Sequence, residues 1–167
     1  FLRHSPLLTI AYLYLIEERF ARYISKKFIN SVSTYDVVHC QELSTCYYLL
    51  HMLHGNNLGK IILTIHSDGN DFAMEFFNYP SLNSFFGRKY LYNKLKFVLE
   101  NVDMVGFVSE GSLKTFLSNH PELPAKRCFF IYNGIEQQFQ LKEWDNYNSG
   151  HIRLVCVGTL KKKKNQI

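Results

Sequence analysis

The sequence predicts an α/β fold in which helices flank a parallel sheet. Short apolar strands alternate along the chain with segments of helical period, an order typical of βαβ units. Polar residues repeatedly follow the strands, as they do in the loops at the carboxyl edge of such a sheet. The chain has 167 residues, of which 47% are hydrophobic, so it can form the core of one domain and the beginning of a second.

The first part of the chain is predicted to contain a long helix, two strands and a shorter helix. Apolar residues at helical spacing predict the long helix at residues 9–29, with one side formed by Leu13, Ile16, Phe20, Ile24 and Phe28. The apolar segments at 36–40 and 60–65 are the expected strands. Between them, residues 43–53 form the expected shorter helix, and Gly55 is a suitable carboxyl cap for it.

The second part continues the same alternation and ends in a truncated element. Pro80 breaks an aromatic stretch, and Asn133-Gly134 marks a turn after the last strand of the series. Residues 137–150 are polar and have the character of a linker, whereas the apolar run at 154–157 predicts a strand covered on both faces. The elements before the linker are a polar loop (66–71), the aromatic stretch (72–86), a helix (84–101), a strand (104–108), a helix (110–119) and a strand (128–132).

The net positive charge favours an anionic binding partner but does not indicate which kind. The net charge of +5 suits nucleotides, phospholipid surfaces or nucleic acid.

A zinc site at Cys46, His51 and His54 would need a fourth ligand that the sequence does not show. The apolar run at residues 7–16 covers about half a membrane, so we expect no membrane-spanning segment. No CxxC spacing relates the cysteines, which indicates reduced thiols in a cytoplasmic setting; they are Cys40, Cys46, Cys128 and Cys156.

Short motifs recur directly after or within the predicted strands. In order and spacing the series resembles glycosyltransferase family 4, and the resemblance covers nearly the whole chain from Tyr35 onward. Each motif alone recurs by chance, whereas the series in register is specific. The motifs are DVVH from Asp36, TIHSDG from Thr64, VSE from Val108, IYNGIE from Ile131, and VGTL from Val157 followed by Lys164-Asn165.

The resemblance implies a partial GT-B glycosyltransferase, an architecture in which two Rossmann-like domains face each other across a cleft. Residues 1–136 would form the acceptor domain without its first strand, residues 137–150 the linker, and residues 151–167 the start of the donor domain. The opening strand with its glycine-rich loop would precede Phe1. The paired glutamates that bind the donor would follow Ile167, so the fragment alone is expected to be inactive.

The resemblance also implies the reaction. A sugar would pass from a nucleotide-diphosphate sugar to a glycan or lipid-linked acceptor, with retention of configuration, in surface or capsular polysaccharide synthesis. We expect no metal, no cofactor and no nucleic-acid partner. The protein would be cytoplasmic, with peripheral contact at the inner face of the cell membrane. The sequence does not identify the donor sugar, the acceptor, the linkage or the oligomeric state.

Three residues match positions that handle the donor in this family. His66 follows the TxH strand and is the candidate catalytic residue, where it would steady the sugar or the departing phosphate. Gly158 and Lys164 are the candidates for binding the donor diphosphate. Thr159 stands where the family often has arginine, which removes one diphosphate contact. The lysines at 161–163 are either partly compensating charges or a solvated basic loop.

Four further residues are candidates for the acceptor site or the cleft. Asp68 has a carboxylate that is suited to binding sugar hydroxyls. Ser109 and Glu110 belong to the motif series, but they equally suit the cap and the first turn of the following helix. Asn133 either lines the cleft or turns the chain. For the last three residues, capping and turning are the simpler interpretations.

An aromatic and basic segment between residues 72 and 97 predicts contact with an anionic membrane. Its aromatic side chains would meet lipid and its basic side chains the headgroups. The alternative is that Leu91, Leu95 and Val98 are core residues covered by their aromatic neighbours. The membrane-contact residues would be Phe76, Phe77, Phe85, Phe86, Arg88, Lys89 and Lys96.

Other classes of function are compatible with parts of the sequence. A GT-B sugar-nucleotide epimerase would share the fold. A non-enzymatic module for anionic surfaces would use the lysine run and the aromatic residues, but it predicts clustered arginines and a reader motif that the sequence lacks. A dinucleotide oxidoreductase would carry GxGxxG after a strand, and these 167 residues contain no such motif.

Overall fold

A computed structural model describes residues 5–31, 35–53 and 59–134 of the chain. The chain divides into two units, Phe1–Gly134 and Ile135–Ile167, and only the first contains described residues. The predicted linker at 137–150 and the predicted strand at 154–157 therefore lie outside the described residues. The division of the chain into acceptor domain, linker and donor domain stays a prediction.

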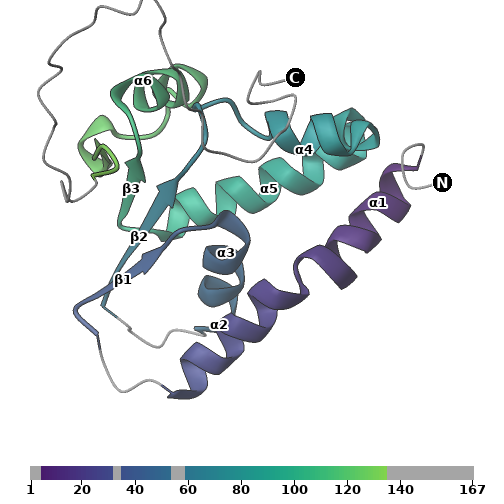
Figure 1. Ribbon diagram of the computed structural model, residues 1–167, viewed down its shortest axis with the longest axis horizontal. Coiled ribbons are helices and arrows are strands. Elements are labelled where there is room, and N and C mark those ends of the chain that lie inside the picture. Colours follow the sequence, from purple (N-terminus) through teal and green to yellow (C-terminus); the bar gives the residue numbers. More distant parts are fainter. Residues whose placement is uncertain (1–4, 32–34, 54–58, 135–167) are drawn as a thin grey trace, which may run out of the picture. The chain divides into compact units, whose positions relative to one another are not determined.

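The described unit is built on a four-stranded parallel sheet (Figure 1). Neighbouring strands pair in register, for example His39 with Ile62, Leu63 with Val105, and Gly106 with Phe129. The α/β class predicted from the alternating pattern is thus confirmed. The strands lie across the sheet in chain order: Val37–Cys40 (β1), Lys60–Ile65 (β2), Met104–Phe107 (β3) and Cys128–Phe130 (β4).

The connecting helices cover one face of this sheet. They are Leu43–Met52 (α3), Phe85–Asn101 (α5) and Glu110–Asn119 (α6). Side chains from alternate strand positions pack with these helices in one buried cluster, which is what right-handed crossovers between strands in chain order produce. The cluster includes Val38, Cys40, Ile61, Leu63, Val105 and Phe107 from the strands and Leu49, Leu95, Val98 and Phe116 from the helices.

The prediction of one continuous helix at residues 9–29 is wrong, because the structure divides this segment into three elements. The segment forms Pro6–Tyr12 (α1), a π-helical turn at Leu13–Glu17 (η1) and Arg19–Ser31 (α2). The backbone N–H of Glu18 donates to the carbonyl of Leu13 at 2.8 Å, the wider bond that defines a π turn. This turn changes the helical phase, so the predicted apolar side does not stay on one face.

Small residues let α2 pack closely against α3. Ala21 and Ser25 are buried, and the Ser25 hydroxyl donates to the carbonyl oxygen of Thr45 at 3.1 Å. Of the predicted apolar side, Phe20 and Ile24 are exposed, whereas Phe28 is half-buried and packs against the main core. A small contact residue lets two helices approach closely, whereas a large one would hold them apart.

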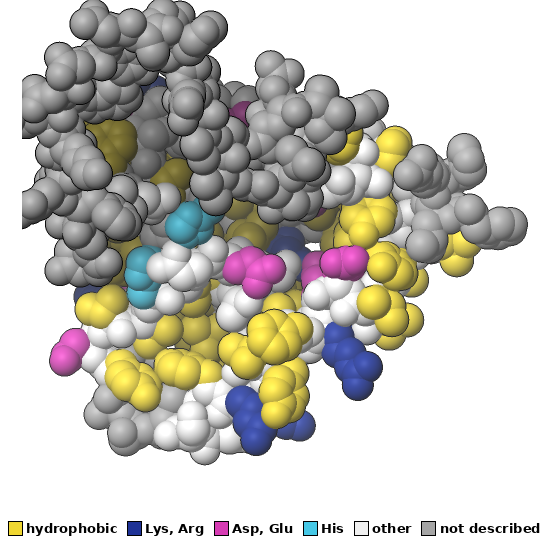
Figure 2. Space-filling model, in the orientation of Figure 1, with side chains coloured by type: hydrophobic (Ala, Val, Ile, Leu, Met, Phe, Trp, Pro, Cys, Tyr) yellow, Lys and Arg dark blue, Asp and Glu magenta, His cyan; other side chains and the backbone are white. Residues whose placement is uncertain are grey.

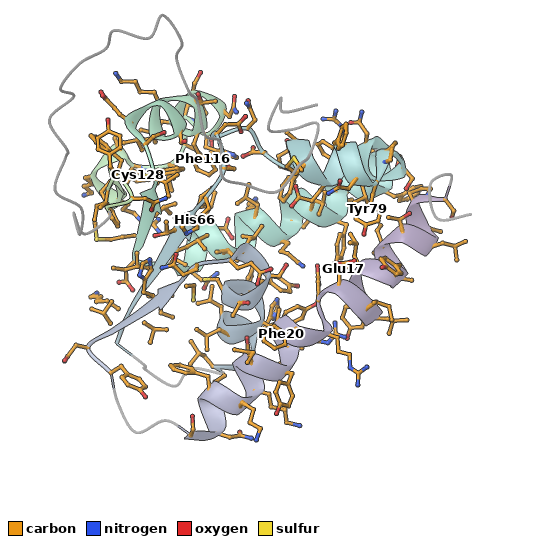
Figure 3. The ribbon with its side chains drawn as sticks, in the orientation of Figure 1. Glu17, Phe20, His66, Tyr79, Phe116 and Cys128 are labelled. Carbon is orange, nitrogen blue, oxygen red and sulfur yellow. The ribbon has the colours of Figure 1, made fainter. Side chains whose placement is uncertain are left out.

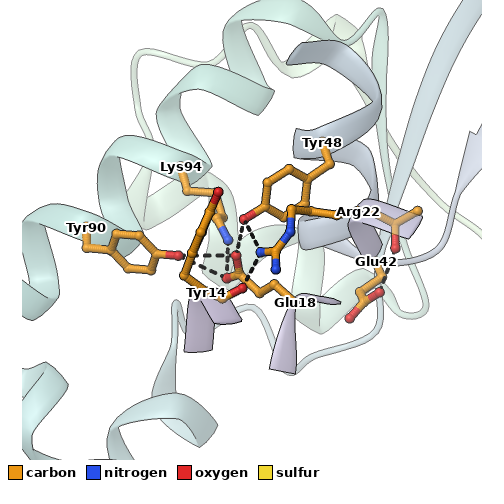
Figure 4. A network of polar contacts seen from close by, with 8 residues as sticks. Tyr14, Glu18, Arg22, Glu42, Tyr48, Tyr90 and Lys94 are labelled. Carbon is orange, nitrogen blue, oxygen red and sulfur yellow. Dashed lines mark hydrogen bonds and ion pairs between the residues drawn. The ribbon is translucent and has the colours of Figure 1, made fainter. Parts of the chain in front are cut away.

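A buried ion pair joins the N-terminal helices to the rest of the unit (Figure 4). The Glu18 carboxylate accepts from the Lys94 ammonium, from the Tyr48 hydroxyl at 2.5 Å and from the Tyr90 hydroxyl at 3.2 Å. The Lys94 ammonium also lies 5.1 to 5.4 Å from the ring centroids of three tyrosines, which adds cation–π attraction. Burial lowers the pKa of Lys94, and the Glu18 carboxylate opposes that shift.

The aromatic stretch after β2 forms a short α-helix and a 3-10 turn. They are Ala73–Asn78 (α4) and the 3-10 turn Pro80–Asn83 (η2), and a second 3-10 turn, Ala125–Arg127 (η3), precedes β4. Leu82 packs with Leu13 and Leu91 in a second buried cluster. The Tyr79 hydroxyl donates to Glu17 at 3.2 Å, which ties η1 to this segment (Figure 3). Within the described residues, no helix combines the length and apolarity needed to cross a bilayer.

The buried pair predicts a sharp difference between two lysines on the same helix. Lys94→Met leaves the Glu18 carboxylate buried without its cation and should lower the free energy of unfolding by about 3–5 kcal/mol. Lys96→Met is the matched control, because Lys96 pairs with Glu100 at 3.8 Å on the surface; its loss should be below about 0.5 kcal/mol. Urea unfolding measures both, and equal losses would contradict the assignment. Adding Glu18→Gln to Lys94→Met should recover part of the loss, because no unpaired charge remains.

Candidate active site

A chain of polar side chains links the carboxyl ends of β1 and β2. These strands are parallel neighbours with Cys40 opposite Leu63, so the residues that follow them leave the sheet at the same edge. The oxygen of the Gln41 amide lies 2.5 Å from Nε2 of His66, and the Gln41 amide nitrogen lies 3.2 Å from the ring nitrogens of His39. His39 in turn bonds the Thr64 hydroxyl at 2.7 Å. His66 is exposed and projects at the carboxyl end of β2 (Figure 3).

The chemistry of Gln41 fixes the tautomer of His66. An amide oxygen can only accept, so Nε2 of His66 must carry a hydrogen and donate it. In the neutral ring Nδ1 is then an acceptor, able to bind a hydroxyl group of a ligand. The motif series predicted His66 as a site residue but gave no role to Gln41. Its only signal in the sequence is its position directly after a strand.

The loop after His66 is tied to the start of α6. The Ser112 hydroxyl donates to the carbonyl of Ser67 at 2.8 Å, and the Ser112 backbone N–H donates to the Ser109 hydroxyl at 3.1 Å. Gly69 has a φ of +88°, and a Cβ atom there would collide with the backbone oxygen of Ser112. Only glycine satisfies both constraints without strain.

Asp68 and Ser109 have turn and cap contacts in the described structure. The backbone N–H of Asn70 donates to Oδ1 of Asp68 at 3.0 Å, which forms an Asx-type turn, and Asp68 is exposed. Ser109 caps α6, and Glu110 pairs with Lys114 at 2.7 Å in the first turns of the helix. The capping interpretation thus accounts for Ser109 and Glu110. Their predicted cleft roles are not tested by these contacts.

Of the remaining predicted site residues, one is described by the structure and two lie outside the described residues. Asn133 is exposed after β4, whose pairing with β3 extends to a bond from the Ile131 N–H to the Phe107 carbonyl at 2.9 Å. Gly158 and Lys164 lie outside the described residues. His51, considered above as a zinc ligand, stacks on Phe97 with ring centroids 4.2 Å apart. Among the described residues, no group of three or more His, Cys, Asp or Glu side chains is arranged to share a metal ion.

A second polar cluster, which no sequence pattern indicates, lies at the far end of the same loop. Nε2 of His120 lies 2.7 Å from Oδ2 of Asp71, and Nδ1 lies 3.3 Å from Glu122. Burial raises the pKa of Asp71, and His120 opposes that shift. Asp71 and His120 are 49 residues apart, so no local pattern relates them. Beside them is a hollow of about 440 Å³ lined by Asn70, Asp71, Phe76, Arg88, Tyr92, Asn119 and His120.

A parallel α/β unit with polar groups gathered at one strand edge is typical of domains that bind nucleotides or sugars. The chain matches the model of Glycosyltransferase Family 4 over residues 2–139, and it belongs to this family. A sugar donor and an acceptor are therefore the substrates implied for the chain. No curated protein and no solved structure matches it.

The positive φ of Gly69 predicts a clear contrast between two glycines near α6. Gly69→Ala should lower the free energy of unfolding by about 2 kcal/mol, because a side chain is strained at this φ and its Cβ would meet the Ser112 backbone. Gly111→Ala is the control, since the nearest atom to its Cβ would be 3.9 Å away. Thermal or urea unfolding measures both. Gly69→Ala proteins as stable as the wild type would show that the loop is not held as described.

The bond from His66 to Gln41 predicts a defined tautomer in solution. Long-range proton–nitrogen NMR at alkaline pH should show His66 almost wholly as the Nε2–H form. Gln41→Leu should lower that fraction towards the ratio of a free imidazole, because the acceptor is gone. Glu42→Gln is a suitable control, because Glu42 is the neighbour of Gln41 but its carboxylate accepts from the Thr45 hydroxyl at 2.7 Å instead of bonding His66. An unchanged tautomer ratio in Gln41→Leu would contradict the contact.

Proposed function

We propose that the chain is part of a retaining glycosyltransferase, with most of the acceptor domain at residues 1–136 and the start of the donor domain at residues 151–167. The enzyme would transfer a sugar from a nucleotide-diphosphate sugar to a glycan or lipid-linked acceptor in the synthesis of a surface polysaccharide. The observation that carries this proposal is the family match over residues 2–139. The clustering of His39, Gln41 and His66 at one strand edge supports it, because that edge is where ligands of such sheets bind.

His66 is the proposed catalytic contact to the donor sugar. The Gln41 amide oxygen accepts a hydrogen bond from Nε2–H of His66. The other ring nitrogen, Nδ1, is directed away from that bond and can accept from a sugar hydroxyl. A ring that is already oriented loses little entropy when the substrate binds. Thr64 and His39 complete the support by fixing Gln41 through its amide nitrogen. Gln41, His39 and Thr64 are thus positioning residues for His66 and not catalytic residues.

Asp68 is the proposed contact to acceptor hydroxyls. Its carboxylate is exposed on the loop that follows His66, and that loop is anchored to α6 through Ser67 and Ser112. A carboxylate can accept hydrogen bonds from two sugar hydroxyls. Ser109, Glu110 and Asn133 would line the same edge of the cleft. For Ser109 and Glu110 this role would add to their role at the start of α6.

The donor diphosphate is proposed to bind at Gly158 and Lys164. A glycine after a strand lets backbone N–H groups approach a phosphate, and a lysine ammonium supplies a compensating charge. Residues 161–163 are lysines that would contribute less, as a solvated basic loop. No resident metal or cofactor is part of this proposal.

The proposal is tested by turnover with a panel of nucleotide-diphosphate sugars. The enzyme that contains this chain together with a donor domain should release the nucleoside diphosphate only when a glycan or lipid-linked acceptor is present. The product linkage should keep the anomeric configuration of the donor. Epimerisation of the nucleotide sugar without any acceptor would identify an epimerase instead.

The donor site predicts unequal effects for two lysines of the same run. In that enzyme, Lys164→Ala should raise the donor KM by about tenfold or more, because it removes a charge-assisted contact to the diphosphate. Lys162→Ala is the matched control and should change the donor KM by less than about threefold, as expected for a solvated charge. Steady-state kinetics at saturating acceptor measures both. Equal effects of the two substitutions would contradict the assignment of Lys164.

A further inference from the structure

The N-terminal helices expose a row of large apolar side chains. On η1 and α2, Ile16 is 58% exposed, Phe20 68%, Tyr23 56% and Ile24 37%. The opposite side of α2 carries the buried Ala21 and Ser25 that pack on α3. Hydrophobic side chains lie along this segment with Lys and Arg side chains between them (Figure 2). Isolated exposed apolar residues are common, but a continuous row on one helix indicates a binding surface.

The charges on the same helix are of one sign. Arg19–Ser31 contains four basic residues and no acidic one. Of these, Arg19, Lys26 and Lys27 are exposed, and the Lys27 ammonium lies 5.9 Å from the Tyr23 ring centroid. The neighbouring carboxylates are engaged elsewhere. Glu17 accepts from Tyr12 and Tyr79, and Glu18 is buried against Lys94.

We propose that this outer face of α2, formed by Phe20, Tyr23, Ile24, Lys26 and Lys27, docks on an anionic lipid bilayer. A helix that presents large apolar side chains beside lysines and no acids lies in the plane of a membrane interface, with its apolar groups below the headgroups. Anionic headgroups complement the lysines, whereas a neutral protein surface would leave them unpaired. The charge of the face therefore favours a bilayer over another copy of this chain, which would place like charges together.

The aromatic segment that the sequence indicated as the membrane contact is less suitable. Phe77, Phe85 and Phe86 are exposed there. Two of the three basic side chains named for it have partners, however. Arg88 donates to the Asn83 side chain at 2.9 Å and lies over the Phe76 ring, and Lys96 pairs with Glu100, whereas Lys89 is exposed. The exposed aromatic pair at Phe85 and Phe86 thus offers a matched comparison for the outer face of α2.

The inference rests on the proposed function in one respect, because a lipid-linked acceptor would be presented at a bilayer. Vesicle binding is measured without donor, acceptor or turnover. Its failure would leave sugar transfer untested, and a failure of sugar transfer would leave vesicle binding unchanged. The two proposals can therefore be rejected separately.

The test is flotation of the 167-residue chain with phosphatidylcholine vesicles that do or do not contain phosphatidylglycerol. The chain should float only with the anionic vesicles. Lys26→Gln with Lys27→Gln should weaken binding by roughly twenty-five-fold, at about fivefold for each lysine. Phe20→Ser with Ile24→Ser should weaken it by about tenfold or more. Phe85→Ser with Phe86→Ser should bind as the wild type does, and matching urea midpoints establish that each variant is folded.

Several results would overturn the proposal. They are no flotation of the wild-type chain, equal binding by all variants, and a loss of binding confined to the Phe85 and Phe86 variant. A concentration-dependent dimer that is dissolved by Phe20→Ser with Ile24→Ser would assign the face to a second copy of the chain instead. The lysine variant keeps the test valid even where the apolar variant is unstable, because Lys26 and Lys27 are exposed.

Discussion

The parallel pairing of β1 with β2 is the constraint on which the candidate site depends. Because Cys40 lies opposite Leu63, the chain leaves both strands at the same edge, and Gln41 reaches His66 across that edge. A register shifted by one residue would turn these side chains to the other face of the sheet and bury polar groups in the core. The apolar core beneath the strands holds this register, so packing far from the site determines the geometry within it.

Sequence patterns predicted the elements whose determinants are local. The strands and α6 were found because continuous apolar runs and helical spacing need only neighbouring residues. The π turn at η1 was missed because Glu18 gains its partners from Tyr48 and Lys94, far along the chain. The same holds for Gln41, which no motif marks, and for the pair of Asp71 with His120. Long-range polar contacts of this kind leave no periodic signal in a sequence.

In the described unit, the charged groups that stabilise the fold are different from those proposed to take part in catalysis. Glu18 and Lys94 satisfy each other in a buried position between helices, where a charge without its partner would be costly. His66 is exposed at the strand edge, with one ring nitrogen held by Gln41. The chain belongs to Glycosyltransferase Family 4, and the catalytic role of this edge is our proposal. The exposed outer face of α2 lies on a different element, so membrane contact and sugar transfer need not compete for the same surface.

The most direct test of the central claim is the turnover number of the complete enzyme with His66 replaced. The account predicts that His66→Ala lowers kcat by about 100-fold or more, as loss of a group that acts on the reacting centre does. His51→Ala should leave kcat within about twofold, because His51 stacks on Phe97 away from the strand edge. Transfer by His66→Ala at the wild-type rate would contradict the claim that this edge carries the chemistry.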